Sequence, residues 1–196
     1  MIKSGDIALS AGAGPFGWLI RKFTRSNVNH AMTLIDFSVL CLHEEIFKRH
    51  AARGWFWHSS YIEEPFSLKD PSVVMVRRIR PEVFADDEAR QRAMLSMAQR
   101  SAQLLGSPYD WMAILDVFND GVFGNKLGRL IRLNSPSRFM CSEAAAWIAR
   151  PEGWGGLTID KGRTNLLTAD PIKPFHKTTP ADIAMAPWLE TVWEAP

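Results

Sequence analysis

The stretch Thr24-Arg-Ser-Asn-Val-Asn-His30-Ala-Met-Thr-Leu-Ile35 places a histidine at the start of a predicted strand. A second stretch, Phe139-Met-Cys141-Ser-Glu-Ala-Ala-Ala-Trp147, places a cysteine at the start of a predicted helix. A thiol at a helix N-terminus and an imidazole that removes its proton are the two halves of an activated cysteine nucleophile. The histidine comes first in the chain, so the predicted fold has the histidine-bearing strand before the cysteine-bearing helix.

The composition is that of a globular protein with a substantial core. The chain has 196 residues, of which 46% are hydrophobic and 22% charged, and we expect one domain over residues 1–196. The net charge is +2 with the two signs interspersed, which argues against the concentrated basic stripe of a nucleic-acid binder. The first residues lack a secretory signal, and no apolar run approaches the roughly 20 residues of a membrane span. We therefore expect a cytoplasmic protein.

Apolar periodicity and turn residues predict an α+β fold with a small antiparallel sheet packed against helices. The clearest helix covers 86–105, with acidic residues in its first turn and a glycine directly after it. A tight turn at 36–38 is expected to join two strands as a β-hairpin. The expected strands are 7–10, 30–35, 39–44 and 72–79, and the other expected helices are 16–23, 111–118, 119–137, 141–149 and one that starts near Thr179.

Cys141 is the predicted nucleophile. The run that follows it, Ser-Glu-Ala-Ala-Ala-Trp-Ile, is strongly helix-forming, so the sulfur would lie in the positive field of the first turn. Free backbone N–H groups of that turn could form part of an oxyanion hole. His30 would take the thiol proton and later return it to the leaving group. The alternative, from the residues alone, is an inert cysteine buried in the core.

A base of this kind is usually oriented by a third polar residue. If the strands 30–35 and 39–44 pair as a hairpin, the second strand presents polar side chains near the histidine. His43 is the first candidate for the third residue, with Glu44 and Glu45 as alternatives. Side chains alternate along a strand, so His43 and Glu44 face opposite ways and only one of them can fill the role.

Metal and disulfide chemistry are not predicted. The chain holds two cysteines, Cys41 and Cys141, and we do not expect a disulfide between them in a cytoplasmic protein. The histidines His50, His58 and His176 have no metal-ligand spacing, and we interpret them as surface or loop residues. We therefore expect neither a metal ion nor an organic cofactor.

Several short motifs occur in a fixed order along the chain. They are Gly5-Asp6-Ile7, the stretch around His30, Gly106-Ser-Pro-Tyr109-Asp110, Phe139-Met-Cys141-Ser-Glu143 and the closing segment Thr179-Pro-Ala-Asp-Ile183. In this order they resemble circularly permuted members of the NlpC/P60 superfamily, and in particular the YiiX/YaeF-like permuted papain-fold proteins. The resemblance implies a single papain-like domain in which the His-bearing strands precede the Cys-bearing helix.

The resemblance also implies a thiol hydrolase or acyltransferase that acts on amide bonds, such as cell-wall peptide links or N-acylated amino acids. Carried over residue by residue, Cys141 matches the nucleophile, His30 the base and His43 the third position, where a glutamate is more usual in the subgroup. Tyr109 matches a recurrent tyrosine that either lines the site or packs beside it. Met32 departs from the pattern, because the family often has glycine at that position.

Two other functions fit the same residues. One is a lipid-directed acyltransferase or thioesterase, with Phe16-Gly-Trp18-Leu-Ile20 and Trp55-Phe-Trp57 as an apolar groove, although packing into the core is the simpler interpretation of both stretches. The other is a binding module that keeps the fold without turnover. The expected partner is a peptide, a peptidoglycan fragment or an N-acyl substrate. Membrane contact, oligomeric state and an export route to the cell envelope are left open by the residues.

Overall fold

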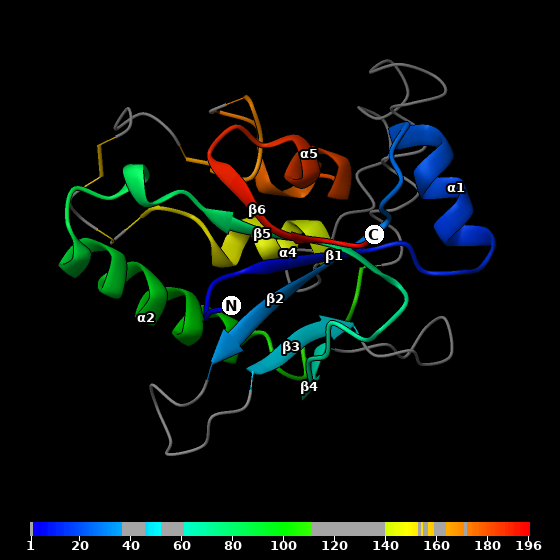
Figure 1. Ribbon diagram of the computed structural model, residues 1–196, viewed down its shortest axis with the longest axis horizontal. Helices are drawn as coiled ribbons and strands as arrows, with labels where there is room; N and C mark the ends of the chain where they lie inside the picture. The colour runs from blue at the N-terminus through cyan, green and yellow to red at the C-terminus, as the bar shows by residue number, and fades with distance from the viewer. Residues whose placement is uncertain are drawn as a thin grey trace.

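The structure is a computed structural model, and it describes residues 2–36, 46–51, 61–110, 140–152, 154, 157–158, 164–170 and 172–196. Over these residues the chain forms a six-stranded antiparallel sheet with helices packed beside it (Figure 1). The α+β fold with an antiparallel sheet, expected from the sequence, is confirmed.

The sheet has the strand order β4-β3-β2-β1-β5-β6, and each neighbouring pair is antiparallel. β2, which begins with the predicted base, is therefore an inner strand with β1 and β3 on its two edges. The expected strands 7–10, 30–35 and 72–79 are confirmed. The observed bounds are β1 (Ile7–Ser10), β2 (His30–Asp36), β3 (Ile46–Ala51), β4 (Tyr61–Pro65), β5 (Val73–Ile79) and β6 (Leu189–Glu194).

The hairpin expected to pair residues 30–35 with residues 39–44 is wrong in its second strand. β2 pairs with β3, and the register places Asp36 opposite Ile46. The expected strand 39–44, with the rest of residues 37–45, lies outside the described residues. Asp and Ser favour turns within a short window, whereas the pairing partner is set by register and burial across the whole sheet.

The helices follow local capping signals. The Asp86 carboxylate accepts the Ala89 N–H at 2.6 Å and starts the helix that was clearest in the sequence. Thr179 caps the last helix, where its hydroxyl accepts the Asp182 N–H at 3.2 Å. The bounds are α1 (Pro15–Thr24), α2 (Asp87–Gln103), α4 (Cys141–Ile148) and α5 (Pro180–Met185), with 3-10 helices η2 (Pro81–Val83) and η4 (Phe175–Lys177). The helices expected at 111–118 and 119–137 lie outside the described residues.

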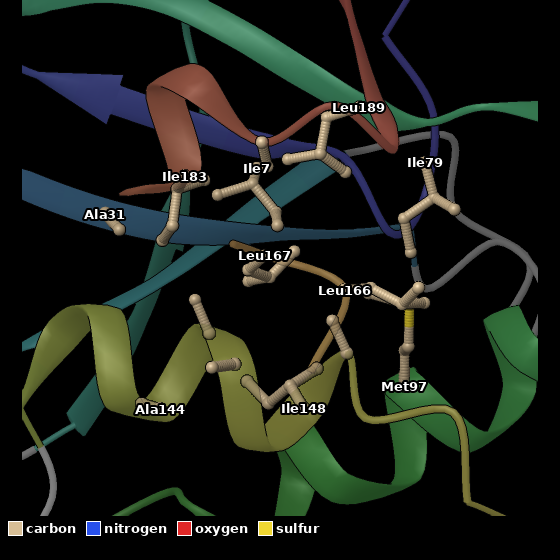
Figure 2. Close-up of a cluster of buried hydrophobic side chains, with 14 of the residues drawn as sticks. Ile7, Ala31, Ile79, Met97, Ala144, Ile148, Leu166, Leu167, Ile183 and Leu189 are labelled. Atoms are coloured by element: carbon tan, nitrogen blue, oxygen red, sulfur yellow. The ribbon is translucent and has the colours of Figure 1, made fainter. Parts of the chain in front are cut away.

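The main core lies between the sheet and the helices α2, α4 and α5. Figure 2 shows side chains of β1, β2, β5 and β6 meeting side chains of these helices, with two leucines of the segment before η4 between them. The labelled members are Ile7, Ala31, Ile79, Met97, Ala144, Ile148, Leu166, Leu167, Ile183 and Leu189. The alternate residues of the strands form a second buried cluster on the other face, made of Ala8, Met32, Leu34, Val73 and Val76.

A buried ion pair joins the start of β1 to β5. The Asp6 carboxylate accepts the Nε and Nη2 hydrogens of Arg78, both at 2.7 Å. It also accepts the Lys3 N–H at 2.8 Å, and the Asp6 carbonyl accepts the Leu34 N–H of β2 at 2.8 Å. The hydrogen bond to Asp6 raises the pKa of the Arg78 guanidinium. One residue therefore links the N-terminal turn, β2 and β5.

Asp6→Asn should lower the free energy of unfolding by about 3 kcal/mol, because the partly buried charge of Arg78 would lose the carboxylate that accepts two of its hydrogen bonds. Urea unfolding measures this change. The matched control is Glu88→Gln, which breaks the exposed Arg92–Glu88 pair at a similar distance, 2.6 Å. The control should change stability by less than about 0.5 kcal/mol. Equal losses in the two variants would contradict the importance of burial at Asp6.

Candidate active site

Cys141 is the first residue of α4, and only 4% of its surface is exposed. α4 packs against β2, and the side chains of Ala144 and Ala145 are buried in the shared core. Short side chains let a helix approach a sheet closely. Cys141 does not take part in a disulfide. Its sulfur is therefore a free thiol held inside the protein at a helix N-terminus.

Two opposing influences act on the Cys141 thiol. Burial is the larger one, and it raises the pKa of the thiol above its ordinary value. Hydrogen bonds from the main chain of Ala31, the Tyr109 hydroxyl, and the main chain of Ser142 and of Cys141 itself lower the pKa, because they stabilise the thiolate. The hydrogen-bond donors around the sulfur thus stabilise the thiolate, whereas burial away from water favours the neutral thiol.

Tyr109 was predicted to line the site or pack beside it, and the structure places it against the sulfur. Its side chain is buried in the main core. Burial raises the pKa of the Tyr109 phenol well above its ordinary value, and the neighbouring Cys141 and Asp110 raise it further. The phenol therefore keeps its proton and can donate it in a hydrogen bond to the sulfur.

The strand that begins with His30 passes beside this sulfur. Leu34 donates its N–H to the carbonyl of Asp6, the residue directly before β1, at 2.8 Å, so the N–H of Ala31 points to the opposite edge of β2. Because this N–H reaches the Cys141 sulfur, the sulfur lies at that edge, next to the first residue of the strand. Alternation along β2 puts His30 on the same face as Met32, whereas the Ala31 side chain faces α4.

A buried acidic pair lies beside the first turn of α4. The Glu143 carboxylate accepts the N–H of Met140, the residue before the cysteine, at 3.2 Å. Burial raises the pKa of Glu143 to about 7, and the nearby Asp110 raises it further, against the lowering effect of the Met140 hydrogen bond. The motif at 106–110 therefore meets the motif at 139–143 at two points. Tyr109 contacts the Cys141 sulfur, and Asp110 lies near Glu143. Neither acid was among the predicted site residues, although a glutamate at the third helical position is a known capping signal.

The second residue of α4 is anchored to the C-terminal part of the chain. The hydroxyl of Ser142 donates to the Thr178 carbonyl at 2.6 Å. The Thr178 hydroxyl in turn accepts the Asn165 amide at 2.8 Å, and this amide also donates to the Lys173 carbonyl at 3.0 Å. These buried hydrogen bonds fix the first turn of α4, and with it the direction of the Cα–Cβ bond of the cysteine.

The candidates for the third residue, His43, Glu44 and Glu45, lie outside the described residues. The hairpin that was expected to bring them to His30 is replaced by the pairing of β2 with β3, so that argument for their proximity no longer holds. In the part of the chain that the structure describes, no group of three His, Cys, Asp or Glu side chains is arranged to hold a metal ion.

A cavity of about 740 Å³ lies elsewhere, between the N-terminal turn, β5 and α2. Its walls include the ion pair of Asp6 and Arg78 and the apolar side chains of Phe84 and Met94. None of the predicted catalytic residues lines it. We therefore locate the candidate active site at Cys141 and not in this cavity.

Together, the fold and the site define an α+β protein with a buried cysteine at the N-terminus of a helix that packs on an antiparallel sheet. No protein-family model and no curated protein matches the chain. Its fold is YiiX-like: it is similar to the solved structure of the metalloprotein YiiX from Escherichia coli O157:H7, with a TM-score of 0.55. The two chains are 18% identical, and the match covers 98% of this chain and 97% of that one. The described residues here contain no ligand set that fits a metal ion.

Glu143→Gln should reduce the loss of stability that is expected as the pH rises from about 4.5 to about 7. The pKa of Glu143 in the folded protein is about 7, above its ordinary value of 4.5. Its contribution to stability is therefore complete below pH 4.5 and is lost as the pH rises through 7. Urea unfolding at a series of pH values measures the difference between the two proteins. Glu152→Gln, at an exposed glutamate, is the control and should keep the wild-type pH dependence. Parallel curves for wild type and Glu143→Gln would contradict the shift.

Proposed function

We propose that the protein is a cysteine-dependent amide hydrolase with a permuted papain-like arrangement, in which Cys141 is the nucleophile and His30 the base. One observation carries the proposal: the Tyr109 hydroxyl, the main chain beside His30 and the first-turn amides of α4 converge on one sulfur. The order of the motifs and the YiiX-like fold are consistent with the NlpC/P60-type arrangement that the sequence resembles.

In the proposed reaction His30 accepts the thiol proton, and the Cys141 sulfur forms a bond to the carbonyl carbon of the substrate amide. The first-turn amides donate hydrogen bonds to the oxyanion that results. The C–N bond then breaks, and the amine leaves with the proton from His30. Water gives a proton to His30 and attacks the thioester, the C–S bond breaks, and the proton returns to the sulfur. The products are a carboxylic acid and an amine.

The proposal makes two demands on the site. Because burial raises the pKa of Cys141, the thiol has to be ionised by the base during the reaction instead of standing as a thiolate. Side chains alternate along β2, so His30 is directed to the face of the sheet opposite α4. For the reaction, its ring has to rotate past the end of β2 toward the sulfur. His30 is the first residue of the strand. His43, Glu44 or Glu45 would orient the ring.

The substrate class we propose is a cell-wall peptide or an N-acylated amino acid. Both carry an amide whose hydrolysis needs an activated nucleophile and a donor for the leaving amine, which are the roles given to Cys141 and His30. A donor of this kind is also available in the protonated Tyr109 phenol beside the sulfur.

Cys141→Ala should abolish hydrolysis of muropeptides and N-acyl amino acids and remove covalent trapping by a thiol-directed acyl probe. His30→Ala should lower kcat by roughly 10²- to 10⁴-fold, the usual contribution of a general base. Cys41→Ser is the matched control and should keep both hydrolysis and trapping at Cys141. Circular dichroism checks that the variants fold. Hydrolysis that persists in Cys141→Ala would rule out the mechanism.

The burial of the sulfur favours a second candidate function, a binding module without turnover. A thiol that is 4% exposed and has a raised pKa is what a purely structural cysteine shows.

Labelling of Cys141 with iodoacetamide near neutral pH separates the two functions. An enzyme should be labelled in the native state, and at least roughly tenfold faster than its His30→Ala variant. A binding module should be labelled only after unfolding, with no effect of His30. Peptide mapping by mass spectrometry distinguishes Cys141 from Cys41.

A further inference from the structure

The outer face of α1 carries exposed aromatic side chains, which is unusual for a surface helix. At roughly 100° per residue, Trp18, Leu19, Lys22 and Phe23 share one side of the helix. Trp18 is 54% exposed and Phe23 37% exposed, and Leu19 is half-buried. The expectation that Phe16-Gly-Trp18-Leu-Ile20 packs into the core is therefore wrong for Trp18, although Ile20 does pack against the main core.

The orientation of α1 is imposed by close contacts on its inner face. The Asn29 side chain accepts the Gly12 N–H and donates to the Gly12 carbonyl, both at 2.9 Å. Gly17 lies against this pair, since a Cβ on it would be 2.3 Å from the Asn29 amide nitrogen. Arg21 also donates to the Gly12 carbonyl at 2.9 Å. Turning the aromatic face inward would break these contacts, so the exposure of Trp18 is built into the fold.

The charge around α1 has one sign. Residues 7–35 contain no Asp or Glu, whereas Arg21, Lys22 and Arg25 are basic. The Lys22 ammonium lies 4.8 Å from the centroid of the Trp18 ring, so a cation and an exposed indole share one site on the surface. Figure 1 shows α1 at the opposite end of the view from α2, projecting from the body of the sheet.

We propose that the outer face of α1 docks the protein on an anionic membrane surface. Trp18 and Phe23 would enter the boundary between headgroups and acyl chains, and Lys22 with Arg25 would contact the lipid phosphates. α1 has ten residues and lies along the surface; among the described residues no helix is long and apolar enough to cross a bilayer. The docking is independent of the function proposed for Cys141.

The chemistry of the face favours lipid over other anionic partners. Indole side chains concentrate at membrane interfaces, where the ring is partly buried and its N–H stays near water. Three basic residues are too few for the phosphate contacts on which nucleic-acid affinity depends. Two exposed aromatic side chains beside a cation instead match the one-sided pattern of an interfacial helix.

Co-sedimentation of the whole chain with vesicles tests the docking. The wild type should bind vesicles of phosphatidylcholine with phosphatidylglycerol, bind weakly to phosphatidylcholine alone, and be released by high salt. Trp18→Ala and Lys22→Glu should each weaken binding roughly fivefold or more. The matched controls are Leu95→Ala, at a 43% exposed leucine of α2, and Lys69→Glu, at another exposed lysine. Both should bind as the wild type does.

Three results would overturn the docking. The first is a wild type that does not sediment with anionic vesicles. The second is equal weakening by the α1 variants and by the controls, which would indicate general hydrophobic or electrostatic adsorption. The third is binding to a single-stranded oligonucleotide at least as tight as to vesicles, lost in Lys22→Glu and kept in Trp18→Ala. That result would assign the basic residues to nucleic acid. Thermal unfolding checks that each variant keeps the fold. Intact folding is expected because the substituted side chains are exposed.

Discussion

The close packing of α4 on β2 is the constraint on which the candidate site depends. Ala144 and Ala145 of the helix and Ala31 of the strand are small and buried, so the two elements approach closely and the first turn of α4 meets the start of β2. That geometry brings the Cys141 sulfur to the main chain of Ala31. A larger side chain at any of these positions would force the helix away from the strand, because cores of this density tolerate little added volume.

Burial and hydrogen bonding have opposite effects on the pKa values at the site. Burial is the stronger influence on the Cys141 thiol and on the Glu143 carboxyl, and it raises the pKa of both. Donors around the sulfur oppose this effect without reversing it. Glu143 holds the Met140 N–H directly before the cysteine, so the charge of its carboxyl and the geometry of the first turn are connected. The hydrogen-bond donors around the sulfur suit a thiolate, whereas burial keeps the thiol in its neutral form.

The described residues carry two features that the fold alone does not assign. The likeness to YiiX establishes the architecture, and at 18% identity it establishes no more than that. Function has to be argued from the sites, because one fold supports many activities. The Cys141 cluster has the components of thiol chemistry, and α1 has an aromatic and basic face held outward by the contacts of Gly17. A hydrolase of acylated or cell-envelope substrates that also docks on a lipid surface would use both features.

The main elements of the fold could be predicted from the sequence. Strands 7–10, 30–35 and 72–79 and the helices that start at Asp86, Cys141 and Thr179 follow from local periodicity and from caps, which depend on residues close together in the chain. The order of the motifs likewise placed a histidine at the start of a strand and a cysteine at the start of a helix, and both positions were confirmed.

Tertiary structure alone decided the rest. That β2 pairs with β3, that Asp110 lies near Glu143, and that Trp18 faces outward depend on contacts between segments far apart in the chain. The residues after β2 favour a turn locally, yet the pairing of a strand is settled by which register buries the most side chains across the sheet. The burial that raises the pKa of Cys141 also depends on segments far apart in the chain. No local sequence pattern predicts which distant side chains cover the sulfur.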